Sequence, residues 1–195
     1  MDHSTIISLK SQVDSIYELF DFIEKVAGRP KDLDSSLREV FEHELLKVVL
    51  YFSASDGKIS VHEKEFINEL FDNRLTTKQL ATLIEKANIY STEFENDELL
   101  CLMILKRFDE KIISRGQEPS VPLIIDTMEL IVKAFITSDN DVDDQEVEDF
   151  KIYFSNLREK YIDEEDAFLG RTFKKNSSSR INDNSLKDYY LKKKK

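Results

Sequence analysis

Two short acidic segments carry the residue types that could hold a metal ion. Residues 53–66 read SASDGKISVHEKEF, and residues 137–149 read TSDNDVDDQEVED. Carboxylate oxygens are the ligands that Ca²⁺ and Mg²⁺ prefer in proteins. The candidate metal ligands are Asp56, Glu63, Asp139, Asp141, Asp143 and Glu146. The chemistry that these residues support is the binding of a divalent cation, with Ca²⁺ or a similar ion as the candidate.

The first segment does not form an ordinary EF-hand calcium loop. Such a loop has glycine at its sixth position, a bidentate glutamate at its twelfth, and oxygen ligands at its first and third. Aligning Gly57 and Glu63 with the sixth and twelfth positions places Phe52 and Ala54 at the first and third. Neither of these side chains carries an oxygen, so two required ligands are missing.

A second interpretation is that the same acids cap helices. Ser60 and Glu63 have the S-x-x-E spacing of a capping box, in which each side chain accepts a hydrogen bond from the other residue's backbone N–H. Asp143 and Glu146 repeat this spacing with an aspartate in first place. A cap stabilises a helix by about 0.5–2 kcal/mol, which is reason enough to place an acid there without a metal. Both interpretations stay open at this point.

The elements that must position these acids have the apolar spacing of helices. Residues 4–27 and a segment that starts near Ser35 or Ser36 have this spacing, and the second segment becomes apolar all round after Leu45. Further helix starts are predicted at Ser60/Glu63, Thr76/Gln79, Thr92/Glu95, Pro119/Pro122 and Asp143/Glu146. The chain holds only 4 glycines and 3 prolines, which disfavours folds rich in tight turns. We predict an all-α fold, a compact bundle of about seven helices without strands.

The two acidic segments belong to a longer internal repeat. At an offset of 83 positions, Val49 pairs with Val132, and Phe52 with Phe135. Asp56 then pairs with Asp139. The simplest architecture is a pair of related helical hairpins about a pseudo-two-fold axis, with halves at about 36–90 and 119–165. We expect an N-terminal helix over 1–34 packed on the core, a helical domain over 35–170, and a basic mobile tail over 171–195.

This duplicated pattern resembles the tellurite-resistance TerB-like family. An apolar helix end is followed by Ser-Asp, a turn, a β-branched residue and an acidic helix, in residues 53–66 and again in residues 137–149. The second copy has Asn140 where the first has Gly57. The resemblance implies a helical domain, also similar to one in some membrane-anchored J-domain co-chaperones. It further implies an acidic surface that binds divalent metal, through Asp56 and Glu63 by motif and through Asp139 and Glu146 by repeat.

Charge indicates the partners that the chain favours. The formal net charge of the chain is −11. Residues 171–195 hold nine Lys/Arg and two Asp and so have a charge of +7, which means that residues 1–170 have a charge of −18. An acidic body is not expected to bind nucleic acid. It fits a basic protein partner. The basic tail either solubilises the chain, folds back on the acidic body, or contacts an anionic membrane surface.

The sequence contains no motif that indicates an enzyme. His3, His43 and His62 are scattered, and Cys101 lies in an apolar run that indicates burial. No stretch approaches the roughly 18 apolar residues of a membrane span, and the N-terminus does not resemble a signal peptide. We expect a cytoplasmic protein, at most peripheral at the inner membrane face. The expected function is that of a non-enzymatic scaffold in a stress- or defence-related assembly. The alternatives are a metal-responsive sensor and an inhibitor or immunity protein that presents an acidic face.

Overall fold

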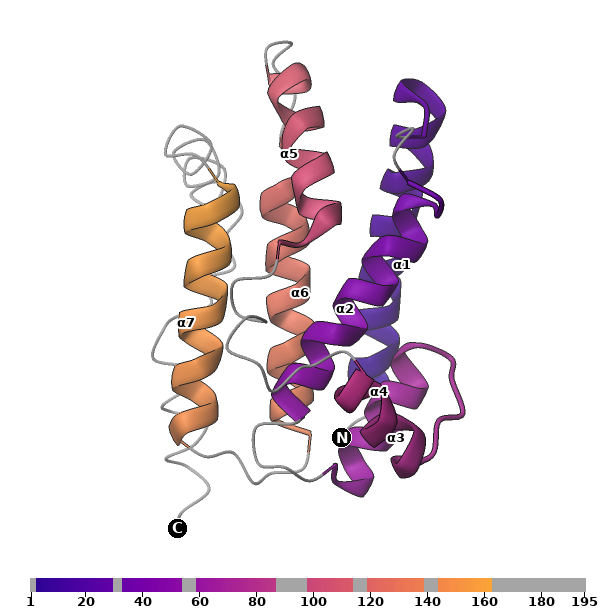
Figure 1. Ribbon diagram of the computed structural model, residues 1–195, viewed down its shortest axis with the longest axis vertical. Coiled ribbons are helices and arrows are strands. Elements are labelled where there is room, and N and C mark those ends of the chain that lie inside the picture. Colours follow the sequence, from indigo (N-terminus) through magenta and orange to yellow (C-terminus); the bar gives the residue numbers. More distant parts are fainter. Residues whose placement is uncertain are drawn as a thin grey trace. The chain divides into compact units, whose positions relative to one another are not determined.

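The computed structural model describes residues 3–29, 33–53, 59–86, 98–113, 119–138 and 144–162. Within these ranges the chain forms seven α-helices and no strand (Figure 1), which confirms the predicted all-α fold. The helices are α1 (His3–Ala27), α2 (Leu37–Ser53), α3 (Val61–Leu70), α4 (Thr77–Lys86), α5 (Leu100–Ile113), α6 (Val121–Ile136) and α7 (Asp144–Tyr161). All seven belong to one compact unit, Met1–Tyr161. The predicted mobile tail over 171–195 lies outside the described residues.

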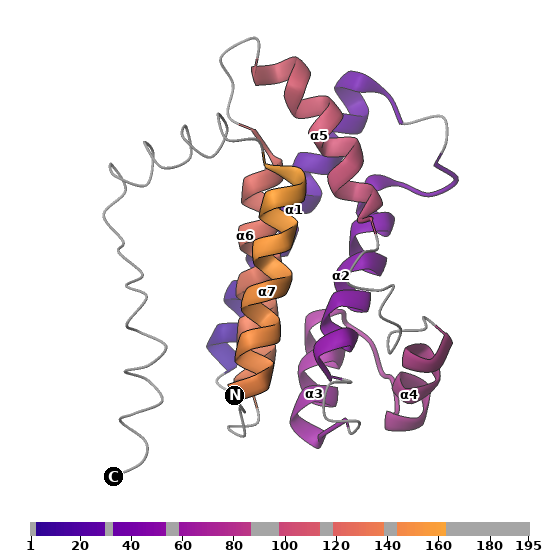
Figure 2. The ribbon, with the colours of Figure 1, turned by 60° about the vertical axis from the view of Figure 1, so that its left-hand side comes forward.

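Helices α2 and α6 form the centre of this unit. α2 contacts α1, α3, α4, α5 and α6, while α6 contacts α1, α2, α3, α5 and α7. Both helices can be surrounded because both are apolar on most sides. In α2, Val48, Val49, Leu50 and Phe52 are at most 2 % exposed, as expected for the segment that follows Leu45. Figure 2 shows α7 in front of α6, α5 at the top of the view, and α3 and α4 beside the lower end of α2.

The amphipathic helix predicted over residues 4–27 is α1. Its buried residues lie three or four positions apart, as an apolar stripe requires, and they are Ile6, Leu9, Val13, Ile16, Phe20 and Ile23. This stripe packs against α2, α3 and α6. The helix ends at Ala27, and Gly28 follows it with a φ of +77°, the left-handed conformation that glycine adopts without strain after a helix.

The starts of α3 and α4 are fixed by local sequence. Ser60 and Glu63 form the predicted capping box: the Ser60 N–H donates to Glu63 Oε2 at 2.7 Å, and the Glu63 N–H donates to Ser60 Oγ at 3.1 Å. Thr76 and Gln79 make the same pair of contacts at 2.9 and 3.3 Å. Each box satisfies backbone donors that the first turn of a helix leaves without partners.

The starts of α5 and α6 are instead capped by carboxylates from other helices. Glu44 of α2 accepts from the backbone N–H groups of Leu100 and Cys101, at 2.5 and 3.1 Å. Asp109 of α5 accepts from the Val121 N–H at 2.8 Å and from the Ser120 hydroxyl at 2.6 Å. Thr92 and Glu95, where a helix start was predicted, lie outside the described residues. α5 itself begins at Leu100, after two described residues that are not helical.

Candidate functional site

The structure describes two of the six candidate metal ligands. Glu63 lies in the first turn of α3, and Glu146 lies in the first turn of α7. Asp56, Asp139, Asp141 and Asp143 lie outside the described residues. The relative placement of the two acidic turns therefore stays a prediction, as does the internal duplication.

Glu63 has the capping role that its spacing predicts. One of its carboxylate oxygens accepts from the Ser60 backbone, so the side chain is directed back over the start of α3. His62, its neighbour, is exposed, as expected for a surface helix residue. Glu146 is half-buried beside Asp144 at the start of α7, where the helix dipole favours negative charge by about 0.3–1 kcal/mol. Both acids thus have a structural reason for their positions.

The helices that flank the two acidic turns contact one another through aromatic rings. Phe52, at the end of α2, packs edge-to-face against Phe150 of α7, with ring centroids 6.1 Å apart. Phe135, at the end of α6, packs against Phe66 of α3 at 5.4 Å. Phe52 and Phe135 are partners at the offset of 83 residues. Each therefore contacts the helix that follows the other acidic turn.

Two buried hydroxyl groups stand directly beside these turns in the sequence. Ser53 is the last residue of α2, and Ser138 lies two residues after α6. They are 1 % and 3 % exposed, and within the described ranges the Oγ atoms of both have no hydrogen-bond partner. A buried hydroxyl without a partner costs about 1–3 kcal/mol. Sequence reasoning did not predict that either hydroxyl is buried, because serine near a helix end is usually exposed.

A buried polar cluster surrounds the start of α5. The Glu44 carboxylate, 9 % exposed, binds the N–H groups of Leu100 and Cys101, and the Tyr161 hydroxyl accepts from the Leu99 N–H at 2.9 Å. Burial raises the pKa of the Glu44 carboxyl above its ordinary value, and the hydrogen bonds from α5 offset part of that rise. The cluster joins α2, α5 and α7 at one point.

The thiol in this cluster stays protonated. Burial, reinforced by the neighbouring Glu44 carboxylate, raises the pKa of Cys101 well above its ordinary value. Burial also raises the pKa of Tyr161 to about 12, and that of the deeply buried Tyr153 further. A nucleophilic cysteine needs a lowered pKa and some exposure, whereas Cys101 is fully buried. Cys101 is therefore the small buried apolar residue that the sequence indicates.

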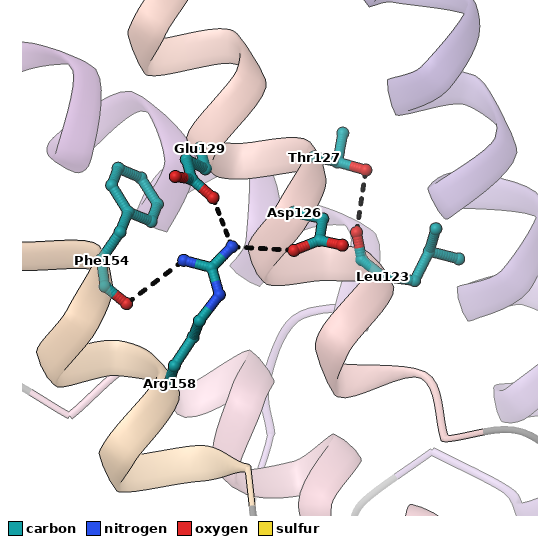
Figure 3. Close-up of polar contacts among 6 residues, drawn as sticks. All are labelled: Leu123, Asp126, Thr127, Glu129, Phe154 and Arg158. Atoms are coloured by element: carbon teal, nitrogen blue, oxygen red, sulfur yellow. Dashed lines mark hydrogen bonds and ion pairs between the residues drawn. The ribbon is translucent and has the colours of Figure 1, made fainter. Parts of the chain in front are cut away.

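Arg158 of α7 joins two carboxylates of α6 (Figure 3). Its Nη2 donates to Asp126 Oδ1 at 2.8 Å and also to Glu129 Oε2, while Nη1 donates to the Phe154 carbonyl at 3.4 Å. Burial disfavours the charged guanidinium, but the bonds to Glu129 and Asp126 outweigh it and raise the pKa of Arg158. These contacts tie α7 to α6 at a half-buried position.

The described ranges contain no cluster of three or more His, Cys, Asp or Glu side chains that could hold a metal ion. Four of the six candidate acids are outside those ranges, so this finding does not address the predicted metal site. Over the same ranges, each helix is too short or too polar to cross a membrane.

The chain was compared with protein-family models, with curated proteins and with solved structures. These three comparisons find no match.

Proposed function

We propose that the chain is a non-enzymatic, TerB-like interaction domain that acts as a scaffold in a stress- or defence-related assembly of the cytoplasm. Its acidic turns bind a divalent cation, and the loaded surface contacts a protein partner. The observation that carries the proposal is the recurrence of one acidic segment after both central helices, α2 and α6, which pack against each other.

Electrostatics supports a cation at these segments. The C-terminal end of an α-helix carries about half a negative charge, and α2 and α6 each lead into an acidic turn. Several carboxylates in a confined region repel one another unless a cation neutralises them. The buried hydroxyls of Ser53 and Ser138 place two further oxygen atoms beside the same turns in the chain. Because Glu63 is engaged as a cap, the proposal rests chiefly on Asp56 and Asp139.

The scaffold part of the proposal is supported by the role of the buried titratable groups. Glu44 and Asp109 cap helices, and Cys101 is a protonated core residue. Each of these groups thus has a purpose in folding. A molecule whose buried polar groups stabilise its helix starts is suited to presenting a rigid surface.

Thermal unfolding in the presence of metal ions tests this function. We expect Ca²⁺, or one of Mg²⁺, Mn²⁺ and Zn²⁺, to stabilise the chain by about 2.7 kcal/mol at 100 times its dissociation constant. The double variant Asp56→Asn/Asp139→Asn should lose this stabilisation. Glu85→Gln/Glu159→Gln, which neutralises two exposed acids elsewhere, should keep it. No metal-dependent shift at millimolar concentrations in the wild type would remove the cation from the proposal.

A further inference from the structure

Five apolar side chains of α1 and α6 remain at the surface although the two helices pack against each other. Phe22 and Val26 are 58 % and 63 % exposed, and Leu123 and Leu130 are 56 % and 37 % exposed, while Leu19 is half-buried. We name these five residues the α1–α6 apolar face. Single exposed apolar residues are ordinary, but a group of them on adjacent elements marks an interaction site.

The five side chains lie on one side of the helix pair. On α1, Leu19, Phe22 and Val26 are three and four positions apart and so form one stripe. Tyr17 marks the side of α1 that meets α2, because its ring packs against Phe41 and Arg38 of that helix. At 100° per residue, the stripe is on the opposite side of α1 from Tyr17.

The two leucines of α6 are placed in the same way. Leu123 and Leu130 are two helical turns apart. Arg158, bound to Asp126 and Glu129, marks the side of α6 that meets α7, and Figure 3 shows Leu123 directed away from it. α1 and α6 pack against each other, and Figure 1 shows α2 in front of α1 and α5 in front of α6, so the far sides of α1 and α6 belong to the same face of the unit.

Acidic residues flank the apolar face on both edges. On α1 the flank consists of Asp14, Glu18 and Asp21, which are all exposed, with Lys25 among them. On α6 the flank consists of Asp126 and Glu129, which both form ion pairs with Arg158 of α7. Lys133 lies one turn further along α6. Arg158 and Lys133 balance the two carboxylates of α6, so the excess of negative charge lies on the α1 flank.

We propose that the α1–α6 apolar face binds a cationic amphipathic helix of a partner protein. Apolar side chains at the i, i+3/i+4 and i+7 positions of that helix cover the face, and its lysines or arginines pair with the carboxylates of the α1 flank. The charge selects this occupant. A second copy of the chain brings a net charge of −11, and this negative charge also disfavours an anionic membrane. The face contains none of the candidate metal ligands, so the inference does not depend on metal binding.

A synthetic 18-residue helix of leucine and lysine, with the leucines on one face, is a suitable probe. Its binding to the full chain can be followed by fluorescence anisotropy at 0.15 M salt, beside a peptide with glutamate in place of lysine. We expect the lysine peptide alone to bind. Phe22→Ser and Leu123→Ser should each weaken binding about tenfold or more, because truncation of a central apolar contact commonly costs over 1 kcal/mol. Ile152→Ser is the matched control, since Ile152 is 47 % exposed on α7, and it should change binding less than about twofold.

The charged flank is tested separately. Glu18→Gln/Asp21→Asn should weaken binding a few-fold and flatten its salt dependence, whereas Glu85→Gln/Glu159→Gln should not. Equal binding by wild type, Phe22→Ser and Leu123→Ser would overturn the proposal, as would an equal loss in Ile152→Ser. If the wild type does not bind the peptide but self-associates, and Phe22→Ser abolishes that self-association, the proposal is overturned and the face binds a second copy of the chain instead. Circular dichroism of every variant checks that the helices are retained.

Discussion

At the scale of single residues, buried carboxylates hold the starts of two helices. Glu44 of α2 accepts two hydrogen bonds from the start of α5, and Asp109 of α5 accepts two from the start of α6. The sequence predicts the cap of α3, because Ser60 and Glu63 are three positions apart. It does not predict the cap of α5, because Glu44 and Leu100 are 56 positions apart and only the packing of α2 on α5 brings them together.

Glu44 should make the stability of the protein depend on pH. Its pKa is raised in the folded state, so folding favours the protonated carboxyl. The resulting stability is fully present below the unfolded pKa of about 4.3 and is lost as the pH rises through the folded pKa. In urea unfolding between pH 4 and 8, the unfolding free energy of the wild type relative to Glu44→Gln should therefore fall with rising pH. A constant difference would contradict this account of Glu44.

The capping box of α3 gives a second prediction at this scale. Ser60→Ala should lower the unfolding free energy by about 0.5–2 kcal/mol, because the Glu63 N–H loses its acceptor. Glu65→Ala is a suitable control, since Glu65 is exposed on the same helix. Chemical denaturation measures both. If the two variants were equally stable, the box would contribute nothing to folding.

At the scale of elements, apolar spacing predicts which segments are helical but not which of their sides stay exposed. The stripe over residues 4–27 correctly indicates that Ile16 and Phe20 are buried. Phe22 and Leu123 are as apolar as these residues and yet lie at the surface. Which of the two outcomes applies depends on how α1 packs on α6, a contact between residues more than 90 positions apart. No local pattern contains that information.

The Arg158 contacts give the prediction that belongs to this scale. Arg158→Ala should destabilise the protein by about 1 kcal/mol or less, because the ion pairs are partly exposed and screened by water. The loss should be smaller at high salt. Backbone amides of α7 should exchange faster with solvent, since this helix loses its polar tie to α6. Lys151→Ala, an exposed position on α7, should leave exchange unchanged. Unchanged exchange in both variants would show that apolar packing alone holds α7.

At the scale of the whole molecule, composition and helical spacing were sufficient to predict the fold class. Few glycines and prolines, several capping boxes and continuous apolar periodicity all indicate helices, and the structure has seven of them in its described ranges. The central position of α2 and α6 follows from their apolar character on most sides. The predicted duplication makes these two helices equivalent. Whether the turns that follow them meet depends on Asp56 and Asp139, which lie outside the described residues.

Calorimetric titration of the full chain with Ca²⁺ tests the central claim most directly, because it counts the ions bound. If Asp56 and Asp139 contribute to one shared site, the wild type binds a single ion, and Asp56→Asn and Asp139→Asn each weaken binding strongly. Glu85→Gln should bind as the wild type does. Binding of two independent ions, with one of them lost in each variant, would contradict the account. The absence of any heat of binding for Ca²⁺, Mg²⁺, Mn²⁺ and Zn²⁺ at millimolar concentration would contradict it as well.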